Sequence, residues 1–245
     1  MNRKEIAFAI IVGCVLTKAS ADQVIVPIPV GNTEIYQPFA LHLAQAPSMR
    51  YQQVFGNQRF LQAVPQGMLI TAISFGSGNS FTSQQPLFQI DLSTTPLGPD
   101  ALSAVFAENI GGDNKTVFGP KGIYWQHFDT GYSLTVPLDQ AFLYLPATGN
   151  LLLDVRNFQA EQNCTPLGGN CAKAFDAQFT MGDAVSLVFA PSVSALTATT
   201  TDTAGLGAVF TFTPIPEPSV AKLCAAAVAA MGIWWRIRRK GQSDL

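Results

Sequence analysis

Four aspartates are the residues of this sequence best suited to acid–base chemistry. Asp129, Asp139, Asp154 and Asp176 are spread along the middle of the chain, and glycoside hydrolysis uses a pair of such carboxylates. A β-domain of this size offers some such pair by chance. We therefore predict that the chain is not an enzyme, and we keep a polysaccharide-active enzyme as a second alternative.

No motif supports another catalytic chemistry. The two histidines, His42 and His127, lie far apart and belong to no metal or nucleophile motif. The chain has no G-x-S-x-G, no H-E-x-x-H and no phosphate-binding loop. Gly112 and Asp113 could begin a calcium loop, but its repeated oxygen ligands are missing, so we expect a turn. The sequence predicts no catalytic residue, no metal and no cofactor.

Aromatic residues around one predicted strand suggest a binding role. Tyr124 and Trp125 are followed by His127, Phe128 and Tyr132, and exposed aromatic rings stack on sugars. Tyr124 and Trp125 are therefore candidate sugar-stacking residues. Aromatic residues at strand spacing more often belong to the core, so both interpretations stay open.

Two cysteines remain once the terminal segments are set aside. Cys164 and Cys171 flank a short loop of turn-forming residues. In an oxidising compartment this spacing predicts a disulfide that closes the loop. A metal site is not expected, because no further cysteine or histidine is near enough to complete four ligands.

The elements that position these residues are short strands separated by turns. Alternation, β-branched residues and turn formers predict strands at 24–30 (proline-interrupted, at an edge), 49–55, 68–75, 88–92, 116–125, 132–136, 141–145, 151–158, 174–180, 184–190 and 208–212. Such a series predicts an all-β fold, an antiparallel β-sandwich of jelly-roll type. The net charge of −2 gives no reason to expect nucleic acid as a partner.

Individual segments carry further expectations. The segments 68–75 and 151–158 are apolar enough to be central strands, and Phe88, Ile90 and Leu92 alternate with polar residues as in a half-buried strand. Residues 101–110 could form a short helix or an irregular crossover. Asp154 and Arg156 share one face, so we expect them to pair side by side on the surface, with a ligand-facing surface as the alternative.

The N-terminus has the features of a secretory signal peptide. Arg3 and Lys4 precede an apolar run, 6–16, and an A-x-A site ends at Ala21. This pattern predicts cleavage between Ala21 and Asp22, a signal peptide at 1–21 and an exported domain at 22–213. A lipobox ending at Cys14 is the alternative, but the apolar run continues past that cysteine.

The C-terminus combines a proline-rich stalk, an apolar segment and a basic end. Alternating prolines from Pro214 to Pro218 exclude helix and sheet interiors. The uncharged run 223–235 ends in two tryptophans and predicts a single transmembrane helix, whose positive flank stays in the cytoplasm. The basic cluster consists of Arg236, Arg238, Arg239 and Lys240.

This tail, 214–240, resembles the PEP-CTERM sorting signal of Gram-negative bacteria, with Pro216, Glu217 and Pro218 as its motif. Tails of this kind are also classed as an ice-binding protein C-terminal domain. The resemblance implies a membrane-anchored precursor, processing by an exosortase-type enzyme, and delivery to the cell surface or extracellular matrix. An ordinary membrane anchor remains the alternative.

These features together predict an exported envelope or extracellular-matrix protein with a structural or adhesive role. The expected partners are the processing enzyme, the inner membrane and an exopolysaccharide. A carbohydrate-binding module for that exopolysaccharide is the alternative function.

Overall fold

Antiparallel strands make up most of the described chain. The computed structural model describes residues 21–26, 34–35, 38–39, 48–77, 81–127, 131–158, 175–179 and 181–215. Strands account for 58% and helices for 9% of the structure, and every pairing between named strands is antiparallel. The predicted all-β class and its antiparallel sheets are confirmed.

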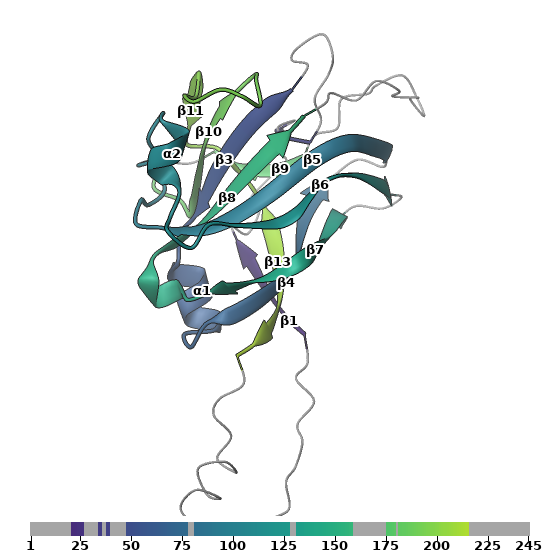
Figure 1. Ribbon diagram of the computed structural model, residues 1–245. Coiled ribbons are helices and arrows are strands. Elements are labelled where there is room, and N and C mark those ends of the chain that lie inside the picture. The colour runs from purple at the N-terminus through teal and green to yellow at the C-terminus, as the bar shows by residue number, and fades with distance from the viewer. Residues whose placement is uncertain are drawn as a thin grey trace, which may run out of the picture. The chain divides into compact units, whose positions relative to one another are not determined.

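One sheet has four strands (Figure 1). In order across the sheet they are β1 (Asp22–Val26), β13 (Ala208–Pro214), β4 (Met68–Ser77) and β7 (Gly131–Tyr144). Strand β1, the described start of the proline-interrupted segment, lies at an edge and β4 lies inside, as predicted. The expectation that Pro214 belongs to a stalk outside any sheet is wrong, because Pro214 ends β13 opposite Met68. The expectation of two strands at 132–136 and 141–145 is wrong, because β7 runs through both. Its pairing with β4 is irregular beside Pro137, and an edge strand tolerates the missing proline N–H.

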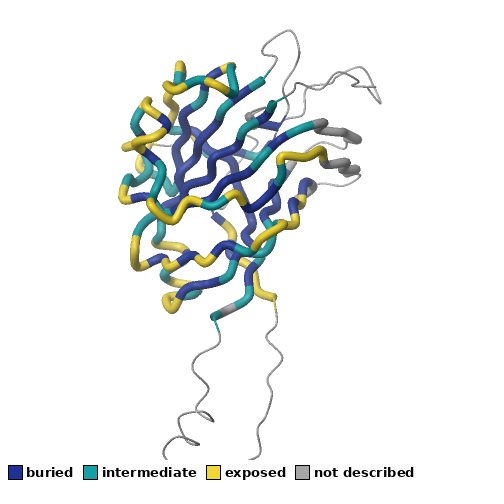
Figure 2. The backbone as a smooth tube through the Cα atoms, in the orientation of Figure 1, coloured by how far each residue is buried: buried dark blue, intermediate teal, exposed yellow. Residues whose placement is uncertain are grey.

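A second sheet has six strands. Its order is β11 (Thr200–Asp202), β10 (Val185–Ala190), β3 (Met49–Phe55), β8 (Asn150–Asn157), β5 (Phe81–Thr95) and β6 (Lys115–His127). Strand β8 lies between β3 and β5, which confirms that the densest apolar segment is central. Both faces of β3 and β8 are largely buried, as Figure 2 shows by their dark blue traces.

A small third sheet packs on the main core and is also hydrogen-bonded to β3 through one side-chain amide. It comprises β12 (Gly205–Leu206), β9 (Phe175–Gln178) and β2 (Glu34–Ile35). Gln53 on β3 donates from Nε2 to the Leu206 carbonyl (2.9 Å) and accepts from the Leu206 N–H at Oε1 (2.8 Å). The Tyr51 hydroxyl also donates to Gln53. The side-chain amide thus satisfies both backbone groups of a buried β12 residue.

Short helices join the strands. They are α1 (Gln58–Ala63), α2 (Phe106–Asn109) and a 3-10 turn, η1 (Pro146–Thr148). Helix α2 falls inside the segment 101–110, for which a helix or a crossover was expected. Helix α1 was not predicted, and its buried Phe60 anchors it to the core. Within the described ranges, no helix is long and apolar enough to cross a membrane.

The two large sheets share one hydrophobic core. Phe210 on β13 packs edge-on against Phe55 on β3, with ring centroids 5.0 Å apart, and against Phe60 of α1 at 5.3 Å. A second, smaller cluster covers the opposite face of the six-stranded sheet, where Val54 and Leu152 contact the segment that contains Phe106. The strands β10, β3 and β8 of the six-stranded sheet are therefore largely buried on both faces.

Several predicted features lie outside the described residues. They are the signal peptide up to residue 20, the lipobox cysteine Cys14, the disulfide between Cys164 and Cys171, the sorting motif Pro216, Glu217 and Pro218, the transmembrane helix, and the basic cluster Arg236, Arg238, Arg239 and Lys240. These features stay predictions. The described residues belong to one compact unit, 21–215.

Candidate functional site

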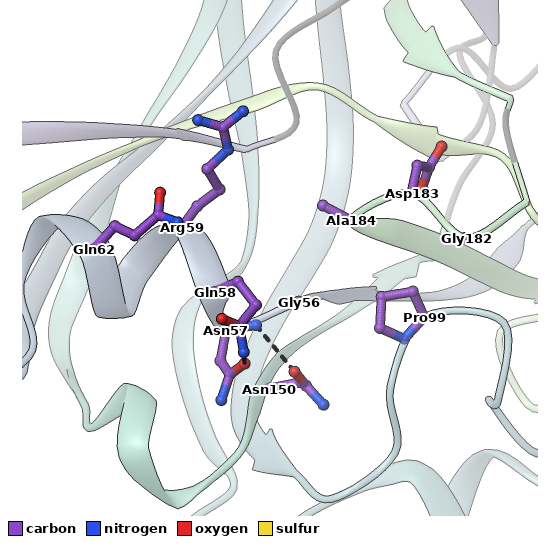
Figure 3. A pocket seen from close by; sticks show the side chains of 10 residues that line it. All are labelled: Gly56, Asn57, Gln58, Arg59, Gln62, Pro99, Asn150, Gly182, Asp183 and Ala184. Carbon is purple, nitrogen blue, oxygen red and sulfur yellow. Dashed lines mark hydrogen bonds between the residues drawn. The ribbon is translucent and has the colours of Figure 1, made fainter.

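An open pocket of about 580 Å³ lies where β3 leads into α1. Figure 3 shows its lining: the first turns of α1 form one wall, the turn before β10 forms the opposite wall, and Pro99 and Asn150 lie between them. Pockets of this volume accommodate small organic ligands. The lining residues come from four separate segments of the chain.

Two asparagines fix the base of the pocket. Asn150 accepts the backbone N–H of Asn57 at Oδ1 (2.9 Å; dashed in Figure 3) and donates from Nδ2 to the Leu97 carbonyl (3.0 Å). Asn57 in turn donates from its side chain to the Pro146 carbonyl (2.9 Å). These bonds hold the start of α1, the segment after β5 and η1 together, so the base is formed before any ligand binds.

The α1 wall carries side chains with free hydrogen-bonding capacity. Gln58, Arg59 and Gln62 are all exposed. Gln58 makes one long bond to Asn57 (3.3 Å). Within the ranges that the structure describes, the Arg59 side chain forms no ion pair or hydrogen bond. The Arg59 guanidinium can therefore bind a polar ligand without first breaking an internal contact, and Gln58 would give up only one long hydrogen bond.

The opposite wall is a turn with its own hydrogen bonds. Asp183 accepts the Val185 N–H at Oδ1 (2.8 Å), and Gly182 donates its N–H to Asp100 Oδ2 (2.8 Å). Gly182 has a φ of 79°, a conformation that glycine adopts without strain. Asp100 also donates its N–H to the Ser186 hydroxyl (2.8 Å). These contacts fix the position of the Asp183 carboxylate relative to the strand.

The described residues do not bring together the aspartates considered as a possible carboxylate pair. Asp139, Asp154 and Asp176 lie on β7, β8 and β9, which belong to three different sheets. Asp139 forms an exposed ion pair with Lys121. Asp129 lies outside the described residues.

Asp154 does not form the expected surface pair with Arg156. Its side chain is 2% exposed, and Oδ2 accepts from Arg50 Nη2 (2.9 Å) and from Gln52 Nε2 (2.7 Å). Arg156 lies 3.8 Å from Asp91 instead. The prediction is wrong because the segment containing α2 packs on this face of the sheet, so the face is not a solvent-exposed surface. Asp154 is bonded there to Arg50 and Gln52 of the neighbouring strand β3.

Asp91 is a buried carboxyl group that the sequence pattern does not predict. Asp91 alternates with Ile90 and Leu92 and was expected on the solvent side of a half-buried strand, yet it is 3% exposed. It pairs in register with Asp154 on β8, and its Oδ1 accepts from Gln89 (2.8 Å). No local signal distinguishes this strand from one with a wet face.

The candidate sugar-stacking aromatics lie on an edge strand. Tyr124 and Trp125 belong to β6, where their backbones pair with Gln84 and Ser83 of β5. Their side chains lie outside the described part of the structure, so a stacking role stays a prediction.

The residues proposed as a possible calcium loop form a turn. Asp113 accepts the N–H of Thr94 (2.7 Å) at Oδ1 and the Thr94 hydroxyl (2.6 Å) at Oδ2. Its carboxylate is therefore used to tie the turn to β5. Among the described residues, no three histidine, cysteine, aspartate or glutamate side chains gather as metal ligands.

Comparison of the chain with protein-family models, with curated proteins and with solved structures finds no match.

Proposed function

We propose that this protein is an exported envelope or extracellular-matrix component that adheres to a matrix glycan through the polar pocket. The observation that carries the proposal is the open pocket beside α1, where exposed amide and charged side chains surround a base fixed by hydrogen bonds. In this proposal the protein adheres to the matrix by binding its carbohydrate.

The chemistry of the lining suits a polyhydroxylated ligand. Each sugar hydroxyl both donates and accepts, and each glutamine amide offers two donors and one acceptor oxygen. Gln58 and Gln62 present such amides from one helical wall, four residues apart on the same face of α1. The volume of about 580 Å³ suits a short stretch of saccharide.

The strand order supports a jelly-roll topology for the exported domain. When β10 and β11 are set aside, the sheets read β1-β13-β4-β7 and β3-β8-β5-β6. The chain passes between these sheets at most of its connections, as two Greek keys wound together require. Such folds host many functions, so the topology only places the pocket at one end of β3 and does not choose the ligand.

The proposed cellular location of the protein is inferred from its terminal segments. The signal peptide pattern ends at Ala21, and the tail with Pro216, Glu217 and Pro218 resembles the PEP-CTERM sorting signal. Delivery to the cell surface or matrix would place the pocket among exopolysaccharides. We propose the exosortase-type enzyme and the inner membrane as transient partners.

A glycan array tests the binding role. The full-length protein, purified in detergent, is expected to bind a matrix glycan, and the double variant Gln58→Ala/Gln62→Ala is expected to lose most of that binding. Gln140→Ala, an exposed glutamine on β7, is the matched control and should bind like the parent. Binding that survives in the double variant would exclude this pocket, and loss in Trp125→Ala would instead favour aromatic stacking on β6.

The intact mass and the cellular location of the mature protein test whether the tail is a sorting signal. In a host that carries the sorting enzyme, the mature protein is expected to lose the segment beyond about Pro218 and to leave the inner membrane. In a host lacking the enzyme it should keep the tail and stay in the membrane. Retention of the tail in both hosts would indicate an ordinary anchor and would overturn the matrix location.

A further inference from the structure

The pocket has an electrostatic polarity between its walls. Of its lining residues, Arg59 is the one cation and Asp183 the one anion among those that the structure describes. Figure 3 shows them on opposite sides of the pocket, Arg59 on α1 and Asp183 on the turn before β10. They are not within ion-pair distance of each other. A ligand in the pocket therefore meets a positive wall and a negative wall.

The two charged groups differ in how they are held. Asp183 is tied to its own turn through the bond from the Val185 N–H. Arg59 is exposed and has no hydrogen-bond or ion-pair partner in the described part of the chain. Its planar guanidinium offers paired donors whose geometry matches a carboxylate. Arg59 is thus available to an acidic ligand group.

The described lining offers no aromatic ring on which a sugar could stack. It contains glycine, alanine, proline, amide and charged residues. A neutral sugar would gain chiefly neutral hydrogen bonds, each of which contributes less than a hydrogen bond to a charged group. A bidentate bond between guanidinium and carboxylate is about twice as strong as a neutral one. The pocket therefore favours an acidic ligand over a neutral ligand of the same shape.

We propose that the pocket selects acidic saccharides of the uronate class, and this inference rests on the proposed glycan-binding function. The sugar carboxylate binds Arg59 on the α1 wall, where Gln58 and Gln62 are close enough along the helix to reach ring hydroxyls. The Asp183 carboxylate on the opposite wall repels the sugar carboxylate and so directs it to the α1 wall. The polarity of the walls thereby sets the orientation of the sugar.

The experiment compares a short oligogalacturonate with the neutral galactose oligomer of the same length. Calorimetric titration of the full-length protein in detergent is expected to show tighter binding of the acidic oligomer, weakened by added salt. Arg59→Ala should lower the affinity for the acidic oligomer about tenfold or more and leave the neutral oligomer little changed. Unchanged thermal unfolding of this exposed-site variant shows that the fold is intact.

A variant of the opposite wall makes the test two-sided. Asp183→Asn keeps an oxygen that can accept the Val185 N–H and removes the negative charge. It is expected to raise the affinity for the acidic oligomer, opposite in sign to Arg59→Ala. Equal effects of either variant on both oligomers would overturn the assignment.

The outcomes separate this inference from the function on which it rests. Binding of the neutral oligomer alone, or acidic binding that ignores Arg59→Ala, overturns the uronate class and leaves glycan adhesion standing. Binding of neither oligomer also overturns the uronate class, and the glycan array then decides the proposed function by itself.

Discussion

Arg50 and Asp154 form an ion pair of 2.9 Å on neighbouring strands of the six-stranded sheet, with side chains only 11% and 2% exposed. The Arg50 guanidinium also lies 4.6 Å from the centre of the Phe106 ring, which belongs to the covering helix α2. Asn109, at the end of that helix, donates to Gln52 (2.8 Å), and Gln52 donates to Asp154. The buried charges therefore connect the sheet to its cover.

Removing one partner of this pair is expected to destabilise the fold strongly. Asp154→Ala leaves Arg50 charged and largely buried, so the free energy of unfolding should fall by about 3–5 kcal/mol. Denaturant titration measures the loss. The double variant Arg50→Met/Asp154→Leu should recover much of it, because it removes both charges. A double variant less stable than Asp154→Ala would contradict this account.

The shared core predicts a large effect at Phe210. Its ring contacts Phe55 of the other sheet and Phe60 of α1, so Phe210→Ala should lower the free energy of unfolding by about 3–5 kcal/mol. Phe179→Ala is the control, since that ring is 45% exposed and its loss should cost no more than about 0.5 kcal/mol. Thermal unfolding distinguishes the two, and similar midpoints would argue against one core between the sheets.

Two adjacent glycines in the turn after α2 differ in the space available for a side chain. A Cβ at Gly111 would collide with the Thr94 carbonyl oxygen, whereas a Cβ at Gly112 meets no atom within 4 Å. Gly111→Ala is therefore expected to cost about 1–3 kcal/mol, the usual range for an overpacked site. Gly112→Ala should leave stability nearly unchanged. If chemical denaturation shows Gly112→Ala to be the less stable variant, the turn does not approach β5 as closely as described.

Partial burial raises the pKa of the Asp176 carboxyl on β9. Its unfolded value is about 3.9, so its favourable contribution is fully present below about pH 4 and is lost as the pH rises through the higher folded pKa. Asp176→Asn should therefore be more stable than the parent at neutral pH. We expect this difference in the free energy of unfolding to disappear as the pH falls below about 4.

Asp139 provides a control of opposite sign for that pH dependence. The hydrogen bond from Lys121, assisted by the Gly119 N–H, lowers the pKa of this carboxyl. Its small stabilising contribution is present above the unfolded pKa and is lost as the pH falls through the folded value. Asp139→Asn should thus be slightly less stable than the parent at neutral pH. The same sign for both variants would refute the assigned causes.

The strands were predictable because their signals are local. Alternation and β-branched residues placed β3 at its observed bounds, and an uninterrupted apolar run placed β8 in the middle of a sheet. Prolines indicated that the first strand would lie at an edge, since proline cannot donate to a ladder. The sequence by itself therefore determined the fold class and the approximate position of most strands.

The ion-pair partners of the buried polar side chains were not predictable, because they depend on which strands become neighbours in the sheet. Arg50 and Asp154 are separated by 104 residues, and only the register of β3 on β8 brings them together. Asp91 is buried on a face that local alternation predicts to be solvated, and it lies beside Arg156 of the neighbouring strand β8. The pocket likewise draws its walls from segments that carry no shared motif. Tertiary structure decided these features, since pairing and burial follow from contacts between distant segments, whereas alternation within one strand reports only the two faces of that strand.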